Sequence, residues 1–188
     1  MKLFVLAILL LFIISDTKAQ QHFVAWKETN PLRWEDFSGK ANDTSHFEAE
    51  SFAEVVYSYR FNNLYDFDFD VKAIFNRNTS WIKKDYKSEA LLKHEQVHFD
   101  IAELFARKLK LAFYNHVYSG NFQAEILQIF NTVKSEYHQV QQQYDDNTNH
   151  SLVTAKQKEW ETRIKDELAR MKQNNIVTAK ERLFVTNK

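Results

Sequence analysis

The first half of the chain alternates between hydrophobic and polar residues in two stretches. Residues 48–60 alternate in part, and residues 67–77, "FDFDVKAIFNR", alternate along most of their length. A period of two is typical of a strand that buries one face. The turn-forming residues "NNLYD" separate the two stretches. We therefore predict an antiparallel hairpin.

From Ser88 onward the hydrophobic residues recur with the period of a helix. The first predicted helix begins with Ser88 as its N-cap and ends at Gly120. The second runs from about Gln123 to Tyr144, and the third begins near Ser151. The polar residues "DDNTNHS" separate the second and third helices, and the last dozen residues of the chain are expected to form a strand or a docked tail.

These elements predict an α+β fold. Residues 22–47 and 78–87 show no regular pattern and are expected to be irregular. A small antiparallel sheet from the N-terminal half would pack on a helical C-terminal half, and together they would form a single domain over residues 20–188.

The first 19 residues have the layout of a signal peptide. Lys2 precedes an apolar run from Leu3 to Ile14, and a polar stretch then ends in Thr-Lys-Ala at Ala19. A membrane anchor is the alternative, but twelve apolar residues are too few to span a bilayer comfortably. We expect cleavage after Ala19, export to the periplasm or the medium, and no membrane anchor in the mature chain.

Composition narrows the possible functions. The 25 basic residues balance the 25 acidic ones, so nothing favours a nucleic-acid partner. Two glycines are too few for a glycine-rich phosphate loop. Without cysteine the chain can form no disulfide, so an exported fold depends on its core and on any bound metal. The oligomeric state stays open.

The first predicted helix contains "HEQVH" at residues 94–98, an HExxH motif. Residues four apart lie on nearly the same helix face, and hydrophobic neighbours place His94 and His98 on the inward face. Two such imidazoles can bind one Zn²⁺, and Glu95 between them can act as general base on the attacking water. The alternative is a pair of core histidines that bond to carbonyl groups.

A zinc site of this kind needs a third protein ligand. Asp100 and Glu103 lie on the opposite face of the helix, where surface pairs with lysines are expected. An antiparallel second helix would return its end towards His94 and bring "YDDNTNHS" close. His150 is the first candidate because imidazole suits zinc beside two others, followed by Asp145. Asp146 is also considered, and an ordinary interhelix loop is the alternative reading.

Two further polar residues lie near this segment. Gln157 shares the hydrophobic stripe of the third helix, so it needs a hydrogen-bond partner such as a zinc-site residue or a tyrosine hydroxyl. Tyr144 is a weaker catalytic candidate, since its hydroxyl can stabilise an oxyanion. A core tyrosine with a satisfied hydroxyl is the simpler reading of this residue.

Three motifs resemble a bacterial family. "LRWEDFSGK", "LLKHEQVHFDIAEL" and "YDDNTNHSLVTAKQKEW" resemble domain of unknown function 922, described as predicted secreted zinc-dependent proteases. The resemblance extends from about Leu32 to Trp160. It implies zinc ligands at His94 and His98 and a catalytic role for Glu95. The resemblance also marks six positions of the late motif, which are Tyr144, Asp145, Thr148, His150, Gln157 and Trp160, and it does not assign any of them to the metal.

The predicted function is an exported zinc-dependent peptidase. His94, His98 and His150, or Asp145 in place of His150, would hold Zn²⁺, and Glu95 would activate water to hydrolyse a peptide or protein substrate. The alternative is a non-catalytic exported domain with a structural or captured zinc. A fourth protein ligand would distinguish the structural site from the catalytic one.

Overall fold

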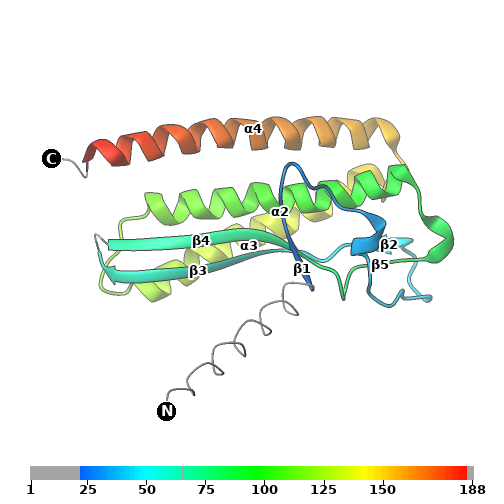
Figure 1. Cartoon of the computed structure of the whole chain (residues 1–188), viewed down its shortest axis with the longest axis horizontal. Coiled ribbons are helices and arrows are strands. Elements are labelled where there is room, and N and C mark those ends of the chain that lie inside the picture. The colour runs from blue at the N-terminus through cyan, green and yellow to red at the C-terminus, as the bar shows by residue number, and fades with distance from the viewer. Residues whose placement is uncertain (1–21, 65, 186–188) are drawn as a thin grey trace, which may run out of the picture.

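A computed structural model describes the backbone of residues 22–64 and 66–185, and the side chains as far as residue 172. The predicted signal peptide lies outside the described residues. Within them the chain forms a small antiparallel sheet in its N-terminal half and three helices in its C-terminal half (Figure 1). None of the helices in the described part has a stretch long and apolar enough to cross a membrane.

The predicted hairpin is confirmed. Strand β3 (Ala53–Asn63) pairs antiparallel with β4 (Asp66–Asn76), and the register is regular from Ala53 opposite Phe75 to Phe61 opposite Phe67. The sheet has the order β1-β4-β3.

Two short strands, β1 (Phe23–Ala25) and β5 (Trp81–Ile82), lie in segments that were expected to be irregular. A third, β2 (Ala49–Glu50), lies at the start of the segment 48–60 that was expected to be one strand. Strand β1 pairs with β4. Strand β2 pairs with β5, and single turns of 3-10 helix lie at Trp34–Asp36 and Lys84–Tyr86. Strands of two or three residues are too short to show a periodic pattern.

Helix α2 (Glu89–Asn115) begins as predicted, since the Ser88 side chain accepts a hydrogen bond from the Leu91 amide. Its predicted end at Gly120 is wrong. The backbone becomes extended at His116, and the buried Tyr118 folds back so that its hydroxyl donates to the Phe113 carbonyl. This contact stabilises the early end of the helix.

Helix α3 (Phe122–Thr148) is longer than predicted, because "DDNT" continues the helix instead of breaking it. The buried Thr148 hydroxyl donates to the Tyr144 carbonyl inside the last turn, and Asn149 then ends the helix in the left-handed conformation. Helix α4 (Thr154–Val185) continues to the end of the described chain, so the predicted final strand is wrong.

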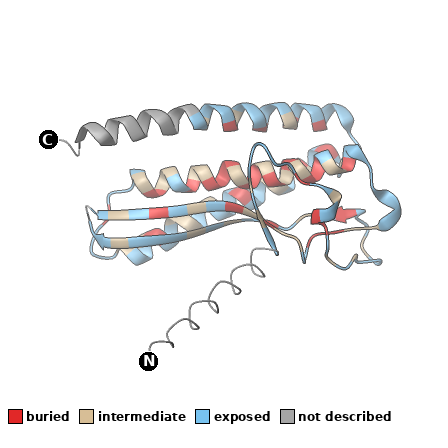
Figure 2. Ribbon diagram, in the orientation of Figure 1, coloured by how far each residue is buried: buried red, intermediate tan, exposed pale blue. Residues whose placement is uncertain are grey.

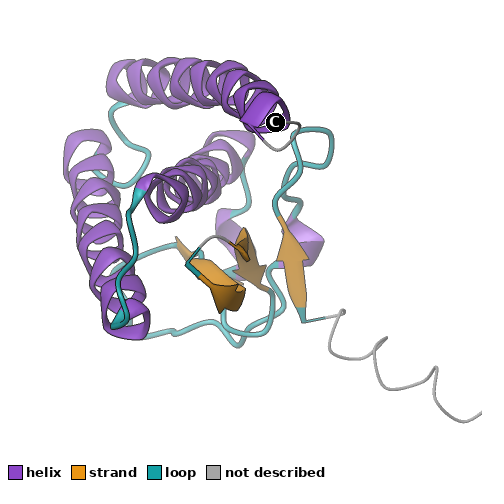
Figure 3. Cartoon of the chain, turned by 90° about the vertical axis from the view of Figure 1, so that its left-hand side faces the viewer, coloured by secondary structure: helices purple, strands orange, loops and turns teal. Residues whose placement is uncertain are grey.

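Helix α2 forms the centre of the fold. It packs against β3 and β4 on one side and against α3 and α4 on others, and its buried residues are seen in Figure 2. Figure 3 shows α4 at the top and α2 between α4 and the strands. The end of α3 lies beside the start of α2, which confirms the predicted antiparallel arrangement.

The motif "LRWEDFSGK" attaches the N-terminal segment to the loop after β4. Asp36 is buried and forms an ion pair with Arg77. The Gly39 amide donates to the Ser80 carbonyl at 2.8 Å. A Cβ on Gly39 would lie 2.7 Å from the Ser80 carbonyl oxygen and 2.8 Å from that of Asn78.

We therefore expect Gly39→Ala to destabilise the protein by about 1–3 kcal/mol through overpacking, which corresponds to several degrees in Tm for a chain of this size. Gly120→Ala is the matched control, because nothing lies within 4 Å of a Cβ at that position. Thermal unfolding followed by circular dichroism measures both variants. Equal melting temperatures would contradict the tight contact at Gly39.

Candidate metal centre

Helix α2 places the HExxH residues against the core. His94 and Glu95 are 2% and 3% exposed, and His98 is half-buried. The helical spacing brings the Nε2 atoms of His94 and His98 to 3.2 Å from each other. The predicted inward face of this helix is confirmed.

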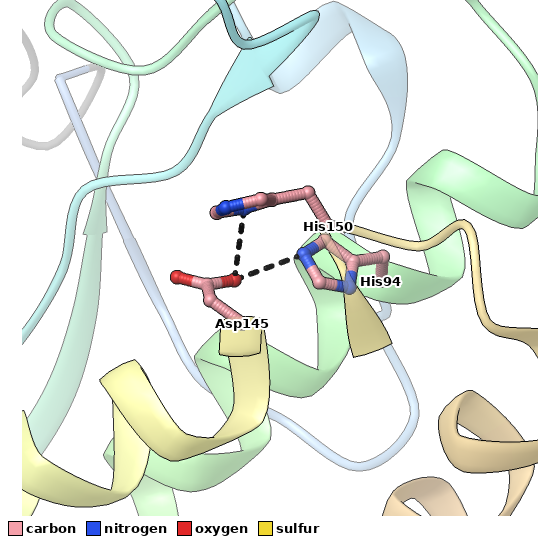
Figure 4. Close-up of side chains that lie close together, drawn as sticks. All are labelled: His94, Asp145 and His150. Carbon is pink, nitrogen blue, oxygen red and sulfur yellow. Dashed lines mark ion pairs between the residues drawn. The ribbon is translucent and has the colours of Figure 1, made fainter. Parts of the chain in front are cut away.

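Both histidines point to one carboxylate oxygen on α3. Asp145 Oδ1 lies 3.2 Å from His94 Nε2 and 2.9 Å from His98 Nε2. His150 Nδ1 lies 3.5 Å from the same oxygen. Figure 4 shows Asp145 between His94 and His150. The structure thus brings both candidate third ligands, Asp145 and His150, to the HExxH histidines.

His150 belongs to a conformationally unusual loop. Asn149, His150 and Ser151 have φ angles of 46°, 50° and 77°, a conformation that residues with a side chain rarely adopt. The His150 side chain is 44% exposed, and its ring lies 4.5 Å from that of Phe47. Such backbone strain persists where surrounding contacts determine it, and it often occurs at functional sites.

Two glutamines hold the other nitrogens of the histidine rings. Gln157 Oε1 lies 3.1 Å from His94 Nδ1, and Gln141 Oε1 lies 2.6 Å from His98 Nδ1. The Tyr144 hydroxyl donates to Gln157 Oε1 at 2.7 Å, and its ring stacks on His94. Gln157 is buried, and its partners His94 and Tyr144 are the zinc-site residue and the tyrosine hydroxyl that were predicted as alternatives. These contacts fix the ring orientations.

Charge and burial compete at this cluster. Burial disfavours a charged His98, but the adjacent carboxylate of Asp145, together with Glu95 and Gln141, raises the pKa of His98 to about 9. Burial also opposes the charge of Asp145, but His94 and His98 hold the pKa of that carboxyl well below its usual range. Burial raises the pKa of Tyr144, so its hydroxyl stays protonated.

The donor set fits a zinc ion. Four ligands at about 2.0–2.2 Å around a tetrahedral zinc lie roughly 3.3–3.6 Å from one another. Four of the six separations among the ligand atoms of His94, His98, Asp145 and His150 are 3.2, 3.2, 2.9 and 3.5 Å, which is close to that range. Asp145 Oδ1 is also buried without a well-formed hydrogen bond to any described residue, although three ring nitrogens surround it. A cation would satisfy this oxygen.

The ligand atoms of His94, Asp145 and His150 all lie within 4.8 Å of one another. Of the two candidate third ligands, His150 is the more exposed, whereas Asp145 contacts all three histidines.

Glu95 faces a cavity of about 950 Å³ beside this cluster. The cavity lies between the segment 46–57 and helix α3, and residues of α2 line it as well. No described residue forms a hydrogen bond with the Glu95 carboxylate. A buried carboxylate without a protein partner is costly unless water, a metal or a ligand satisfies it.

The other acidic and histidine candidates lie elsewhere. Asp100 accepts a hydrogen bond from Trp26 Nε1 at 2.7 Å, and Glu103 pairs with Arg107, so the expected pairs with lysines are wrong. Asp146 is exposed. His116 pairs with Glu125 at the far end of α2.

Sequence reasoning missed Gln141 and the wall of the cavity formed by residues 46–57. The signal for Gln141 was its spacing, four residues from Tyr137 and from Asp145, which places all three on one face of α3. The Gln141 amide also donates to the Tyr137 hydroxyl. The wall at 46–57 carries no motif that marks it in the sequence.

The family model described as "Bacterial protein of unknown function (DUF922)" matches residues 66–151. Over these residues the chain matches the model of the family that its motifs predicted. The match runs from β4 to the loop after α3 and contains all four candidate ligands and Glu95. Searches of the curated proteins and of the solved structures found no significant match.

Proposed function

We propose that this protein is a zinc-dependent peptidase. The observation that carries the proposal is Glu95, a buried residue that faces a cavity beside the cluster of His94, Asp145 and His150 and whose carboxylate has no hydrogen-bond partner among the described residues. A structural zinc site has no use for such a group. A hydrolase needs it as a general base.

His94, His98 and Asp145 would hold the zinc, because their ligand atoms are the closest to one another. Zinc in such a site polarises a carbonyl group and lowers the pKa of water. Gln157 and Gln141 orient His94 and His98 through their Nδ1 atoms, as partners of zinc-binding histidines commonly do. Export to the periplasm or the medium, with cleavage after Ala19, belongs to the same proposal.

Glu95 would accept the proton of the attacking water and pass it to the leaving amine. His150, half-exposed at the cavity, would remain available to hydrogen-bond the substrate. Tyr144 is fully buried and bonded to Gln157, so we assign it a positioning role on His94 in place of direct contact with substrate.

A closed zinc site is the second candidate, and one observation favours it. His150 Nδ1 is 3.5 Å from Asp145 Oδ1, so His150 is near enough to act as a fourth protein ligand. Four protein ligands would leave no position for water, and the zinc would then be structural.

The test of the proposed function is hydrolysis of a mixture of synthetic peptides, followed by mass spectrometry. We expect zinc-loaded protein to cleave peptide bonds, a chelator to abolish cleavage, and added zinc to restore it. Cleavage that survives complete removal of metal from folded protein would contradict the proposal. So would the absence of cleavage by zinc-loaded protein across the whole mixture.

A further inference from the structure

Strand β3 has an unpaired edge. The sheet order is β1-β4-β3, so β3 pairs with β4 on one side, and no described strand lies on its other side. Free edges can accept an additional strand, and proteins commonly protect them with bulges, prolines or covering segments. Here the register is regular along the part of β3 that lines the cavity.

The hydrogen bonds at the start of β3 show which backbone groups face this edge. The Phe52 carbonyl accepts from the Asn76 amide on the β4 side, whereas the Ala53 carbonyl accepts from the Tyr137 hydroxyl of α3 at 2.6 Å. Because successive residues of a strand direct their backbone groups to opposite sides, the N–H and C=O groups of Val55 and Tyr57 face the free edge.

The cavity follows the same edge. Residues 53–57 of β3 line one side of it, and residues of α3 from Phe130 to Asp145 line the other. At the end near β2, the Ser51 hydroxyl is buried and has no hydrogen-bond partner among the described residues. Unpaired polar groups of backbone and side chain therefore face one groove, and such groups are costly without a ligand or water.

The far end of the groove is apolar. Val55, Tyr57, Leu109, Phe130 and Val133 line it. The rings of Tyr57 and Phe130 lie 4.8 Å apart and close this end. A polypeptide added beside β3 would direct every second side chain towards the helices, where an apolar side chain fits.

A chain of hydrogen bonds connects this edge to the candidate metal centre. The Tyr137 hydroxyl donates to the Ala53 carbonyl, and the Gln141 amide donates to the same hydroxyl at 2.8 Å. The other atom of that amide group, Gln141 Oε1, contacts His98 Nδ1. The position of β3 is thus fixed relative to His98.

We propose that β3 is a docking strand, on which an extended polypeptide segment with an apolar side chain pairs with the backbone of Val55 and Tyr57. This inference rests on the proposed function, because the segment would be the substrate that the centre cleaves. It defines the substrate class as an unfolded or extended stretch of protein, held mainly through its backbone.

The test measures binding separately from cleavage. Fluorescein-labelled casein, an unfolded polypeptide, is titrated with zinc-loaded Glu95→Gln protein, and fluorescence anisotropy reports binding. Val55→Pro is added to this background to remove the N–H that faces the groove without loss of a bond to β4. Val55→Ala is the matched control, because it shortens the side chain and keeps the N–H. Circular dichroism confirms the fold of each variant.

We expect Val55→Pro to weaken casein binding at least tenfold more than Val55→Ala does, because both variants lose the valine side chain and only the proline variant loses the N–H. Equal binding by the two variants would overturn the docking strand, and so would absence of casein binding to the Glu95→Gln protein. If Val55→Pro does not fold, the Glu95→Gln protein is used with two competitors, Ac-Lys-Val-Thr-Val-Thr-Lys-NH₂ and its fully N-methylated form. We expect only the unmethylated peptide to displace casein, and equal behaviour of the two peptides would overturn the proposal.

The two proposals can fail separately. Casein that binds through Val55 but is not cleaved by zinc-loaded wild-type protein would leave the docking strand in place and remove the peptidase. Casein cleaved with the same kcat/KM by wild type and Val55→Pro would leave the peptidase in place and remove the docking strand.

Discussion

Glu95→Gln is expected to lower peptide hydrolysis by about 10²–10⁴-fold while the protein keeps its zinc. Glutamine has nearly the same shape as glutamate but cannot accept the proton of the attacking water. Glu95 is 3% exposed and its carboxylate makes no hydrogen bond with a described residue, so the substitution breaks no such bond. We expect unchanged folding and metal content together with a fall in kcat.

Glu89→Gln is the matched control on the same helix. Glu89 lies in the first turn of α2, where its exposed side chain pairs with Lys93. An exposed pair of this kind contributes little to stability, so this variant should hydrolyse peptides as wild type does. If Glu95→Gln retained wild-type kcat, Glu95 would not be the general base, and the closed structural site would become the better reading.

Asp145→Ala is expected to weaken zinc binding at least 100-fold, which is more than the roughly 10–100-fold cost of losing an outer hydrogen-bond partner. Asp145 Oδ1 is the atom around which His94, His98 and His150 gather. Its loss would remove a ligand and leave the histidines without a counter-charge. Competition with a fluorescent zinc chelator measures the affinity.

Variants of two neighbouring residues show whether the loss of zinc affinity is specific to Asp145. Asp146→Ala removes the adjacent, exposed carboxylate and should leave zinc affinity unchanged. His150→Ala should keep the zinc if the site is catalytic, and should lose it if His150 is a ligand. Zinc retained by Asp145→Ala and lost by His150→Ala would reverse our assignment of the third ligand.

The HExxH face and the hairpin could be predicted because each depends on a local period. His94 and His98 share the hydrophobic stripe of one helix, and this stripe is visible in the sequence. The requirement for a partner of Gln157 followed from a polar residue in a hydrophobic stripe, and both His94 and Tyr144 contact it. Such local signals hold when the segment folds as one regular element.

The features that could not be predicted from the sequence depend on contacts between segments that are distant in the chain. The end of α3 reads as a polar loop, but Thr148 and Tyr144 are buried on its inner face and continue the helix. Asn149, His150 and Ser151 adopt the left-handed conformation, but none of them is a glycine, so the sequence does not indicate this turn. The wall at residues 46–57 meets the loop after α3 through single contacts such as Phe47 with His150, which no periodic pattern encodes.

The measurement that tests the central claim most directly is calorimetric titration of metal-free, folded protein with Zn²⁺. Convergence of His94, His98 and Asp145 predicts saturable binding of one zinc per chain. Absence of saturable binding, with the fold verified by circular dichroism, would contradict the account. His94 and His98 would then be core histidines paired with a carboxylate.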